Sequence, residues 1–240
     1  TDKNPNILVI LIDDAGYNDF GFMGSKEMQT PNIDALTSEG VVFTDAHVAA
    51  TVSSPSRACL ITGRYGHRFG YECNLSDRTN GLPLEEETIA EVFKTNGYRT
   101  AAIGKWHLGS RDEQHPNNRG FDLFYGMKAG GRDYFYNEKK SDRPGDERNL
   151  LLNDRQVKFE KYLTDAFSEK AVEFINESSQ PFMMYLAYNA VHTPMQATDE
   201  DMAKFEGHPR QKLAAMTYAL DRGVGTVIRG LKDSGKFDNT

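Results

Sequence analysis

Apolar residues form short unbroken runs at several places along the chain. The clearest run is Asn6–Ile12, which reads NILVILI and stops abruptly at Asp13-Asp14. A continuous apolar run of this length is typical of a parallel strand that is buried on both faces. Similar runs predict strands over Tyr98–Ile103 and Phe182–Tyr188, and a further strand over Val41–Val48. These segments are the candidate strands of a central sheet.

Helices are predicted between the strands by apolar spacing and by terminal signals. Thr30-Pro31 offers an N-cap with proline at the first helical position, and Gly40 ends that helix. The other predicted helices are Ser56–Ile61, Thr88–Asn96, Tyr162–Asn176 and Gln211–Lys232. From Leu108 to Asp154 the chain is rich in Gly, Asn, Arg and Asp, which predicts long surface loops.

The alternation of strands and helices predicts an α/β fold with a mostly parallel central sheet flanked by helices. Ligands of such sheets gather at the carboxyl ends of the strands. Three predicted strands are followed by polar groups, namely Asp13-Asp14, Lys105 to His107, and His192. A single polar strand exit is ordinary loop chemistry, but three of this type favour a site.

Composition narrows the class of protein. The 240 residues carry a net charge of −7 and no run of Lys or Arg, which argues against a nucleic-acid partner. No apolar run approaches the roughly 18 residues of a membrane span. The polar N-terminus Thr1–Pro5 shows no signal peptide, and a processed secreted protein would look the same. Cys59 and Cys73 allow at most one disulfide, and the sequence leaves their pairing open.

Two short segments carry candidate chemistry. The adjacent carboxylates of Asp13 and Asp14 repel each other. A bound hard cation such as Ca²⁺ or Mg²⁺ would relieve this repulsion. The alternative to a metal site is an ordinary turn in which both carboxylates are solvated. Ser53 precedes a predicted helix start, where an anion is stabilised, and Arg57 lies one turn further on. Its guanidinium suits an oxyanion such as sulfate or phosphate, although a plain serine-rich helix cap would look the same.

Longer motifs resemble the sulfatase family. Ser53-Ser54-Pro55-Ser56-Arg57 with Thr62-Gly63 is similar to the first family motif, and Gly97–His107 (GYRTAAIGKWH) closely resembles the second. Asn6–Gly16 resembles the opening strand with its paired Asp, and Asn189–Pro194 the downstream His segment. The pieces occur in the family order from residue 6 to the end of the chain.

The resemblance implies an alkaline-phosphatase-like α/β fold that hydrolyses sulfate esters with a divalent metal, usually Ca²⁺. Ser53 matches the residue that a maturation enzyme converts to formylglycine, whose hydrate supplies the nucleophile. Asp13, Asp14 and the modified Ser53 match metal ligands, and Arg57 matches the group that holds the nucleophile. Lys105 matches a sulfate-binding cation, His107 the partner and general base of the nucleophile, and His192 the acid that protonates the leaving oxygen.

The chain departs from the family pattern in two important ways. Ser53 stands where Cys is commoner, and the sequence does not say whether this serine is natural or engineered. Family members are also longer and complete the metal site with a later Asp-Asn pair, which Asp238-Asn239 does not match because no strand precedes it. We therefore expect residues 1–240 to be an N-terminal, partial catalytic domain, inactive alone, with a C-terminal part absent or supplied by a second chain.

The substrate is less defined than the reaction. His67, His115, Arg119, Arg132 and Asp133 lie in predicted loops and are candidate substrate contacts, although ordinary loop packing explains each equally well. The family implies a sulfated carbohydrate or an aryl sulfate, met in a secreted or periplasmic setting after removal of a signal peptide. Two alternatives remain, a phosphomonoester or phosphonate hydrolase of the same superfamily, and a catalytically silent binder of sulfated glycans.

Overall fold

The computed structural model describes residues 4–74 and 81–240, so the first three residues of the polar N-terminus lie outside it. Its sheet has the strand order β1-β6-β2-β3-β4-β5. The strands are β1 (Ile7–Leu11), β2 (Arg99–Lys105), β3 (Leu123–Met127), β4 (Leu151–Leu152), β5 (Arg155–Gln156) and β6 (Phe182–Ala187). The first four strands in spatial order are parallel, and β4 and β5 add a small antiparallel edge. The expected α/β fold is confirmed.

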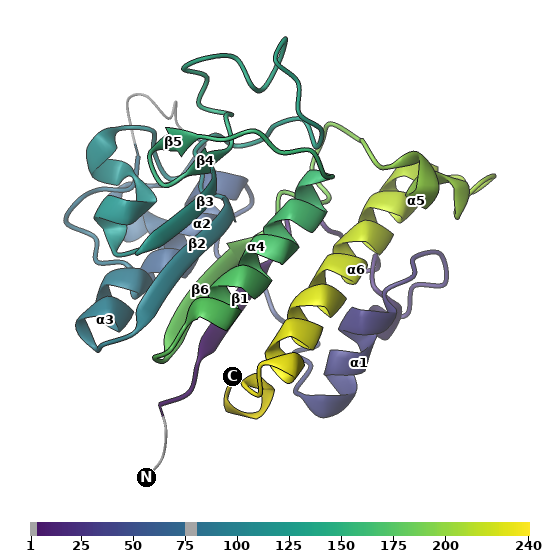
Figure 1. Ribbon diagram of the computed structural model, residues 1–240, viewed down its shortest axis with the longest axis horizontal. Coiled ribbons are helices and arrows are strands. Elements are labelled where there is room, and N and C mark those ends of the chain that lie inside the picture. The colour runs from purple at the N-terminus through teal and green to yellow at the C-terminus, as the bar shows by residue number, and fades with distance from the viewer. Residues whose placement is uncertain (1–3, 75–80) are drawn as a thin grey trace.

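Helices cover both faces of the sheet (Figure 1). The α-helices are α1 (Pro31–Glu39), α2 (Ser53–Thr62), α3 (Ile89–Thr95), α4 (Leu163–Glu177), α5 (Asp199–Ala203) and α6 (Gln211–Asp233). Short 3₁₀ turns are η1 (Gly21–Met23), η2 (Gly66–Phe69), η3 (Asp112–Gln114), η4 (Pro116–Arg119) and η5 (Phe237–Asn239). Within the described ranges, no helix is both long and apolar enough to cross a bilayer.

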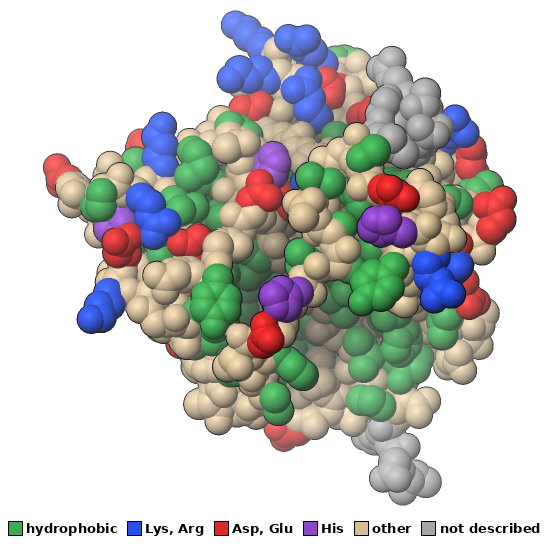
Figure 2. Space-filling view, turned by 180° about the vertical axis from the view of Figure 1, so that it is seen from behind, with side chains coloured by type: hydrophobic (Ala, Val, Ile, Leu, Met, Phe, Trp, Pro, Cys, Tyr) green, Lys and Arg blue, Asp and Glu red, His purple; other side chains and the backbone are tan. Residues whose placement is uncertain are grey.

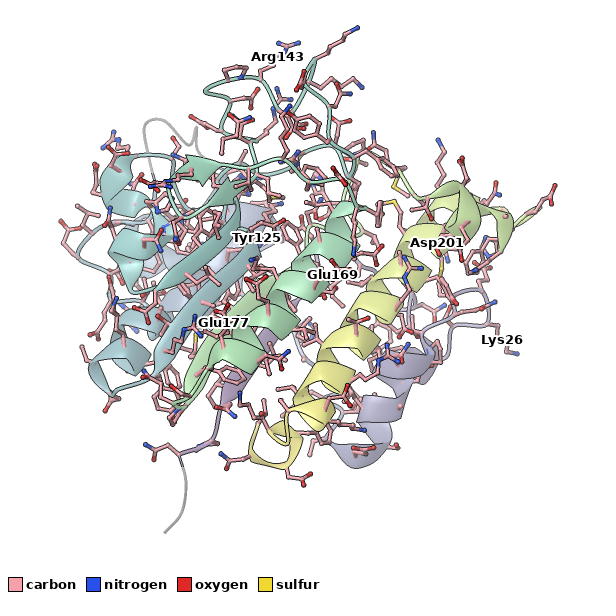
Figure 3. The ribbon with its side chains drawn as sticks, in the orientation of Figure 1. Lys26, Tyr125, Arg143, Glu169, Glu177 and Asp201 are labelled. Carbon is pink, nitrogen blue, oxygen red and sulfur yellow. The ribbon has the colours of Figure 1, made fainter. Side chains whose placement is uncertain are left out.

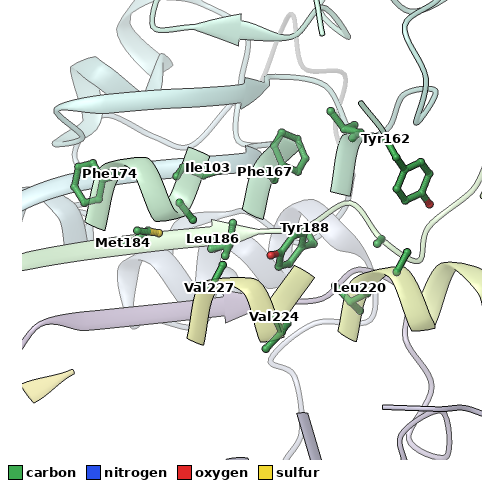
Figure 4. Packing of buried hydrophobic residues seen from close by; sticks show 14 of the residues in the cluster. Ile103, Tyr162, Phe167, Phe174, Met184, Leu186, Tyr188, Leu220, Val224 and Val227 are labelled. Atoms are coloured by element: carbon green, nitrogen blue, oxygen red, sulfur yellow. The ribbon is translucent and has the colours of Figure 1, made fainter. Parts of the chain in front are cut away.

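Alternate residues of the central strands supply two separate cores. Ile103 and Leu186 face α4 and α6, where Phe167 and Val227 meet them (Figure 4). Their sequence neighbours Ala102 and Tyr185 face the opposite side, toward α2 and α3. This two-sided burial explains why the strands are continuous apolar runs rather than alternating ones.

Two sequence predictions are wrong. Val41–Val48 is not a strand but turns and coil, with Val41, Phe43 and Val48 each more than 70% exposed. Its apolar residues find no partner strand among the described residues, so the apolar pattern alone was misleading. The predicted loops of Leu108–Asp154 contain two strands, β3 with five residues and β4 with two, which the surrounding glycines and polar residues obscured in the sequence.

Strand β1 lies at one edge of the sheet, and a groove runs beside it. The groove has a volume of about 510 Å³ and is lined by Leu11, Val48, Cys59, Leu60 and Tyr65 together with neighbouring residues. Figure 2 shows hydrophobic side chains gathered around a hollow on the face seen from behind. The second cysteine, Cys73, is exposed, and both cysteines are free thiols, which answers the pairing question left open by the sequence.

Candidate active site

The polar residues that follow three strands meet at the carboxyl end of the sheet. Asp13 follows β1, Lys105 is the last residue of β2, and His192 follows β6. Backbone hydrogen bonds continue the strand pairing past β1, because the Asp13 amide donates to the Ala190 carbonyl at 2.9 Å. Helix α2 begins at Ser53, and not at Ser56 as the sequence predicted, so Ser53 lies within the first turn that α2 brings to the same edge. The convergence expected from the sequence is therefore present.

Asp13 is the centre of a buried charge network. Its Oδ1 accepts a hydrogen bond from Arg57 Nη2 at 3.0 Å, and its Oδ2 accepts one from Lys105 Nζ at 2.6 Å. All three side chains are buried. Arg57 also donates through Nη1 to the Lys105 carbonyl at 2.9 Å. One carboxylate thus holds two cations in place below the site.

Ser53 lies between a cation and an imidazole. Arg57 Nε donates to Ser53 Oγ at 3.0 Å, and His107 Nδ1 lies 3.1 Å from the same oxygen. Arg57 is one helical turn beyond Ser53, so the residue spacing alone places its guanidinium beside the hydroxyl. A serine oxygen placed in this way has a positive charge on one side and a proton acceptor on the other. That arrangement suits a nucleophile with its base.

Burial controls the protonation of the site. Burial, reinforced by the charges of Lys105 and Arg57, lowers the pKa of His107 to about 3. His107 is therefore neutral near pH 7 and can accept a proton from the group at Ser53. Burial would raise the pKa of Asp13, but Arg57 and Lys105 outweigh it and hold that pKa below its ordinary value.

Lys105 shares its counterion with Arg57, and its pKa reflects this competition. Burial and then the nearby Arg57 charge lower the pKa of Lys105 to about 8, although Asp13 opposes the shift. Two cations with one carboxylate leave a local excess of positive charge at neutral pH. An anion that enters here would compensate that charge.

His192 occupies the outer side of the site. Its Nε2 lies 3.6 Å from Asp14 Oδ2, and its Nδ1 lies 2.6 Å from the Thr193 carbonyl. Asp14 has a positive φ of 55° and an exposed side chain, so it points away from the buried network that holds Asp13. The two adjacent carboxylates therefore have different environments, one buried and paired, the other open to solvent.

Ser54 supports the site and was not singled out from the sequence. Its Oγ donates to the His107 carbonyl at 2.7 Å and also lies 2.7 Å from Tyr71 Oη. His107 has a positive φ of 57°, which is uncommon for a residue other than glycine, and the Ser54 hydroxyl holds its carbonyl. Ser54 lies inside the motif Ser53–Arg57, and this motif is the sequence signal that could have identified it. Nothing in the sequence pointed to Tyr71.

Two of the candidate substrate residues are buried among internal partners. Arg119 donates to Glu91 and to the Leu82 and Glu86 carbonyls. Arg132 forms a fully buried ion pair of 2.6 Å with Asp142. These contacts account for both guanidinium groups without a ligand, and a substrate role for either one stays a prediction.

The other three candidate substrate contacts, His67, His115 and Asp133, differ in their exposure and in their hydrogen-bond partners. His67 is exposed in η2, while His115 is largely buried and its Nε2 lies 3.1 Å from the Asn153 carbonyl. Asp133 accepts hydrogen bonds from Ser141 at 2.7 Å and from Gln196 at 2.9 Å. The loop between β3 and β4, which contains Asp133, projects beyond the sheet, and Arg143 marks its outer part in Figure 3. Substrate contact at these residues also stays a prediction.

A divalent metal fits the chemistry of the site only in part. Asp13 and Asp14 supply the hard oxygen atoms that Ca²⁺ or Mg²⁺ prefers, and Ser53 Oγ is a third oxygen nearby. However, both Asp13 oxygens already accept hydrogen bonds from cations. No group of three or more His, Cys, Asp or Glu side chains suited to a metal occurs within residues 4–74 and 81–240. A metal here would need additional ligands.

Known proteins with similar sequences are sulfatases. The chain is 33% identical to an uncharacterized sulfatase, YdeN, of Escherichia coli (strain K12), over all of this chain and 51% of the relative. It is 38% identical to arylsulfatase G of Mus musculus, over 95% of this chain and 48% of the relative. The chain thus spans about half the length of the curated relatives it matches.

Solved structures agree with this relationship. The crystal structure of Ps i-CgsB in complex with k-i-k-neocarrahexaose matches with a TM-score of 0.93 and 44% identity, covering 99% of this chain and 57% of that one. The crystal structure of the PsFucS1 sulfatase from Pseudoalteromonas sp. matches with a TM-score of 0.79 and 25% identity, over 99% of this chain and 54% of that one. The sulfatase family model matches residues 5–240. The chain therefore belongs to the sulfatase family.

Proposed function

We propose that the protein hydrolyses sulfate esters and releases inorganic sulfate. The observation that carries this proposal is Ser53 Oγ, held between Arg57 Nε at 3.0 Å and His107 Nδ1 at 3.1 Å. A nucleophile, a neutral base and a pair of buried cations thus lie within one site that carries excess positive charge. Catalysis of transfer from an anionic ester depends on this kind of preorganised charge.

Each residue of the site has a chemical task in this proposal. His107, kept neutral by burial, accepts the proton of the attacking hydroxyl. Lys105 and Arg57 balance the negative charge of the sulfuryl oxygens. His192 lies on the open side, where its Nε2 can protonate the oxygen of the departing alcohol. Such a positioned acid contributes about 10²–10⁴-fold for a poor leaving group.

The proposal includes one modified residue and one bound metal ion. Formylglycine at Ser53 supplies, in its hydrated form, a hydroxyl nucleophile and a second hydroxyl that lets sulfate be expelled. Asp13 and Asp14, together with further ligands, would hold a divalent metal, which would supply positive charge beside the ester. Asp14 is the more available of the two ligands, because its carboxylate is exposed and Asp13 is already paired.

A sulfated carbohydrate is the substrate class that we propose. Support comes from Ps i-CgsB, whose structure at 44% identity contains the oligosaccharide k-i-k-neocarrahexaose. Oligosaccharides of that type are therefore the first substrates to test, followed by simple aryl sulfates. We further propose a secreted or periplasmic location, where such polysaccharides are met, and a maturation enzyme as the partner that modifies Ser53.

Mass spectrometry of the protein from its natural host tests the nucleophile. Trypsin releases the peptide Glu27–Arg57, which contains no internal Lys or Arg. Conversion of Ser53 to formylglycine removes two hydrogen atoms and lowers the peptide mass by about 2 Da. An unmodified Ser53 in active host material would contradict the proposed nucleophile.

Paired assays test the reaction. Matched sulfate and phosphate esters of one alcohol are given to the purified host protein. Release of sulfate with little phosphate supports the proposal. Preferential release of phosphate would favour a serine phosphomonoesterase, and binding of a sulfated oligosaccharide without any release would favour a silent glycan binder.

A further inference from the structure

The segment that follows β3 passes directly over two histidines of the site. A Cβ atom added at Gly130 would lie 2.7 Å from both Cε1 and Nε2 of His107. One added at Gly131 would lie 3.3 Å from His192 Cε1 and 3.5 Å from its Nδ1. Two consecutive glycines therefore contact imidazole rings that come from two different strand ends. Neither glycine has a positive φ, so close approach explains these glycines, rather than backbone strain.

The same segment is fastened to the loop that carries His192. Tyr134 is fully buried, and its Oη lies 2.7 Å from the Asn189 carbonyl and 2.8 Å from the His192 carbonyl. Burial raises the pKa of the Tyr134 hydroxyl far above its ordinary range, so it remains a hydrogen-bond donor at every working pH. One phenol thus holds the backbone on both sides of the turn that leads to His192.

Further contacts fix the orientation of Tyr134 itself. Its backbone amide donates to Gln196 Oε1 at 2.8 Å, and its ring stacks on Tyr162 with centroids 5.4 Å apart. Tyr162 Oη donates in turn to the Gln196 carbonyl at 2.8 Å. The loop from Asn189 to Gln196 is therefore held at both ends by one aromatic pair.

The His192 ring has little anchoring of its own. Within residues 4–74 and 81–240, its Nδ1 has one hydrogen-bond partner, the carbonyl of the next residue, Thr193, and its Nε2 lies 3.6 Å from the exposed Asp14. The position of the ring is consequently set by the backbone at residue 192. That backbone is what the Tyr134 hydroxyl holds.

We propose that Tyr134 is a positioning residue for His192. Gly130 and Gly131 contribute to the same arrangement because they leave room for the imidazoles of His107 and His192. This inference rests on the proposed sulfate-ester hydrolysis. In that reaction the nucleophilic oxygen at residue 53 forms a bond to sulfur as the S–O bond of the ester breaks. The electron pair of the broken bond stays on the alcohol oxygen, and His192 Nε2 gives that oxygen a proton. Loss of the Tyr134 hydroxyl leaves the acid chemically intact but poorly placed.

The test is the dependence of rate on the leaving group, measured on the protein as its host processes it. Tyr134→Phe removes the hydroxyl and keeps the stacked ring. Hydrolysis of a sugar sulfate depends on protonation of its poor leaving group. Its kcat should fall about 10- to 100-fold, which is part of the 10²–10⁴-fold that a positioned acid contributes, because the acid is displaced and not removed. The 4-nitrophenolate released from 4-nitrophenyl sulfate is a good leaving group that needs no proton. The kcat for this ester should therefore change less than about 3-fold.

Tyr188→Phe is the matched control. Tyr188 is equally buried, but its hydroxyl lies 2.7 Å from Ser168 Oγ on α4 rather than on the His192 loop. This variant should leave the ratio of the two rates as in the wild type. Gly131→Ala is a second probe, because it displaces the His192 ring without removing a hydrogen bond, and it should reproduce the selective loss on the sugar sulfate.

Hydrogen exchange separates this inference from the proposed function. The amides of Val191 and His192 are protected by bonds to the Asp13 and Asn189 carbonyls. Their exchange should be about tenfold faster or more in Tyr134→Phe and unchanged in Tyr188→Phe. Unchanged exchange, or an equal loss on both esters, would overturn the positioning role. A wild-type protein that hydrolyses neither ester would overturn the proposed function, and the exchange experiment would then decide the inference alone.

Discussion

Replacement of Asp13 by Asn removes the only negative charge that Arg57 and Lys105 share among their described partners. The change keeps the size of the side chain but leaves two buried cations close together. Their side chains are 2% and 0% exposed, so water cannot take over the role of the carboxylate. Removal of one partner from a buried ion pair costs about 3–5 kcal/mol, mainly because the remaining charge is uncompensated.

The protonation of Lys105 sets the size of this effect. Because the pKa of Lys105 is about 8, the lysine is charged at pH 7 and the full cost of about 3–5 kcal/mol is expected there. Above pH 8 Lys105 loses its proton in the wild type as well. Asp13 then compensates Arg57 alone, and Asp13→Asn should cost less.

Urea unfolding followed by far-ultraviolet circular dichroism measures the change. EDTA in the buffer prevents a bound divalent ion from contributing to the difference. Asp14→Asn is the control, because the Asp14 side chain is 65% exposed and its replacement should change stability by no more than about 0.5 kcal/mol. A further Lys105→Met change in the Asp13→Asn protein should restore about 0.5–3 kcal/mol.

Two outcomes would refute the reasoning. An Asp13→Asn protein within about 1 kcal/mol of wild type at pH 7 would mean that the carboxylate does not compensate buried charge. A large loss that Lys105→Met does not relieve would mean that the destabilisation comes from another source than the two cations.

Two further predictions concern other parts of the molecule. His115 accepts a hydrogen bond from the Asn117 amide through Nδ1, and its Nε2 faces the Asn153 carbonyl, so the neutral ring satisfies both. Burial and then the charge of Lys128 lower the pKa of His115. The stabilisation by His115 should therefore be complete above pH 6.5 and decline as the pH falls below that value. In urea unfolding, His115→Gln should reduce the dependence of the free energy of unfolding on pH in this range. Asp142→Asn should cost about 3–5 kcal/mol in the same assay, because it leaves Arg132 buried and unpaired, and a change below about 1 kcal/mol would contradict that pairing.

The helices and central strands were predictable because their signals are local. Pro31 and Gly40 lie at the two ends of α1, where the sequence placed them, and the apolar run before Asp13 forms β1. Val41–Val48 failed because an apolar pattern cannot report whether a partner strand is available. Strand β3 was missed because a five-residue strand with a glycine gives a weak pattern, and its pairing with β2 is a tertiary contact.

The sequence singled out residues that the structure brings close together, but it did not predict every contact between them. Ser53 and Arg57 are one helical turn apart, so their contact follows from the sequence. The pairing of Asp13 with Lys105 depends on how separate strands align, and no local spacing encodes it. The sequence pointed to a metal at Asp13, whereas the structure shows that carboxylate engaged by two cations.

The edge position of β1 has a consequence for how the chain folds. Ile7 pairs with Met183, so β1 acquires this sheet partner only after β6, which lies far along the sequence, has been synthesised. Pairing between segments so far apart in sequence slows folding, because the entropy of closing a large loop is lost before the stabilising contacts form. During that interval an apolar strand with unpaired backbone groups is open to the wrong neighbour. We therefore expect β1 to need protection from wrong pairing on the ribosome until β6 has been synthesised.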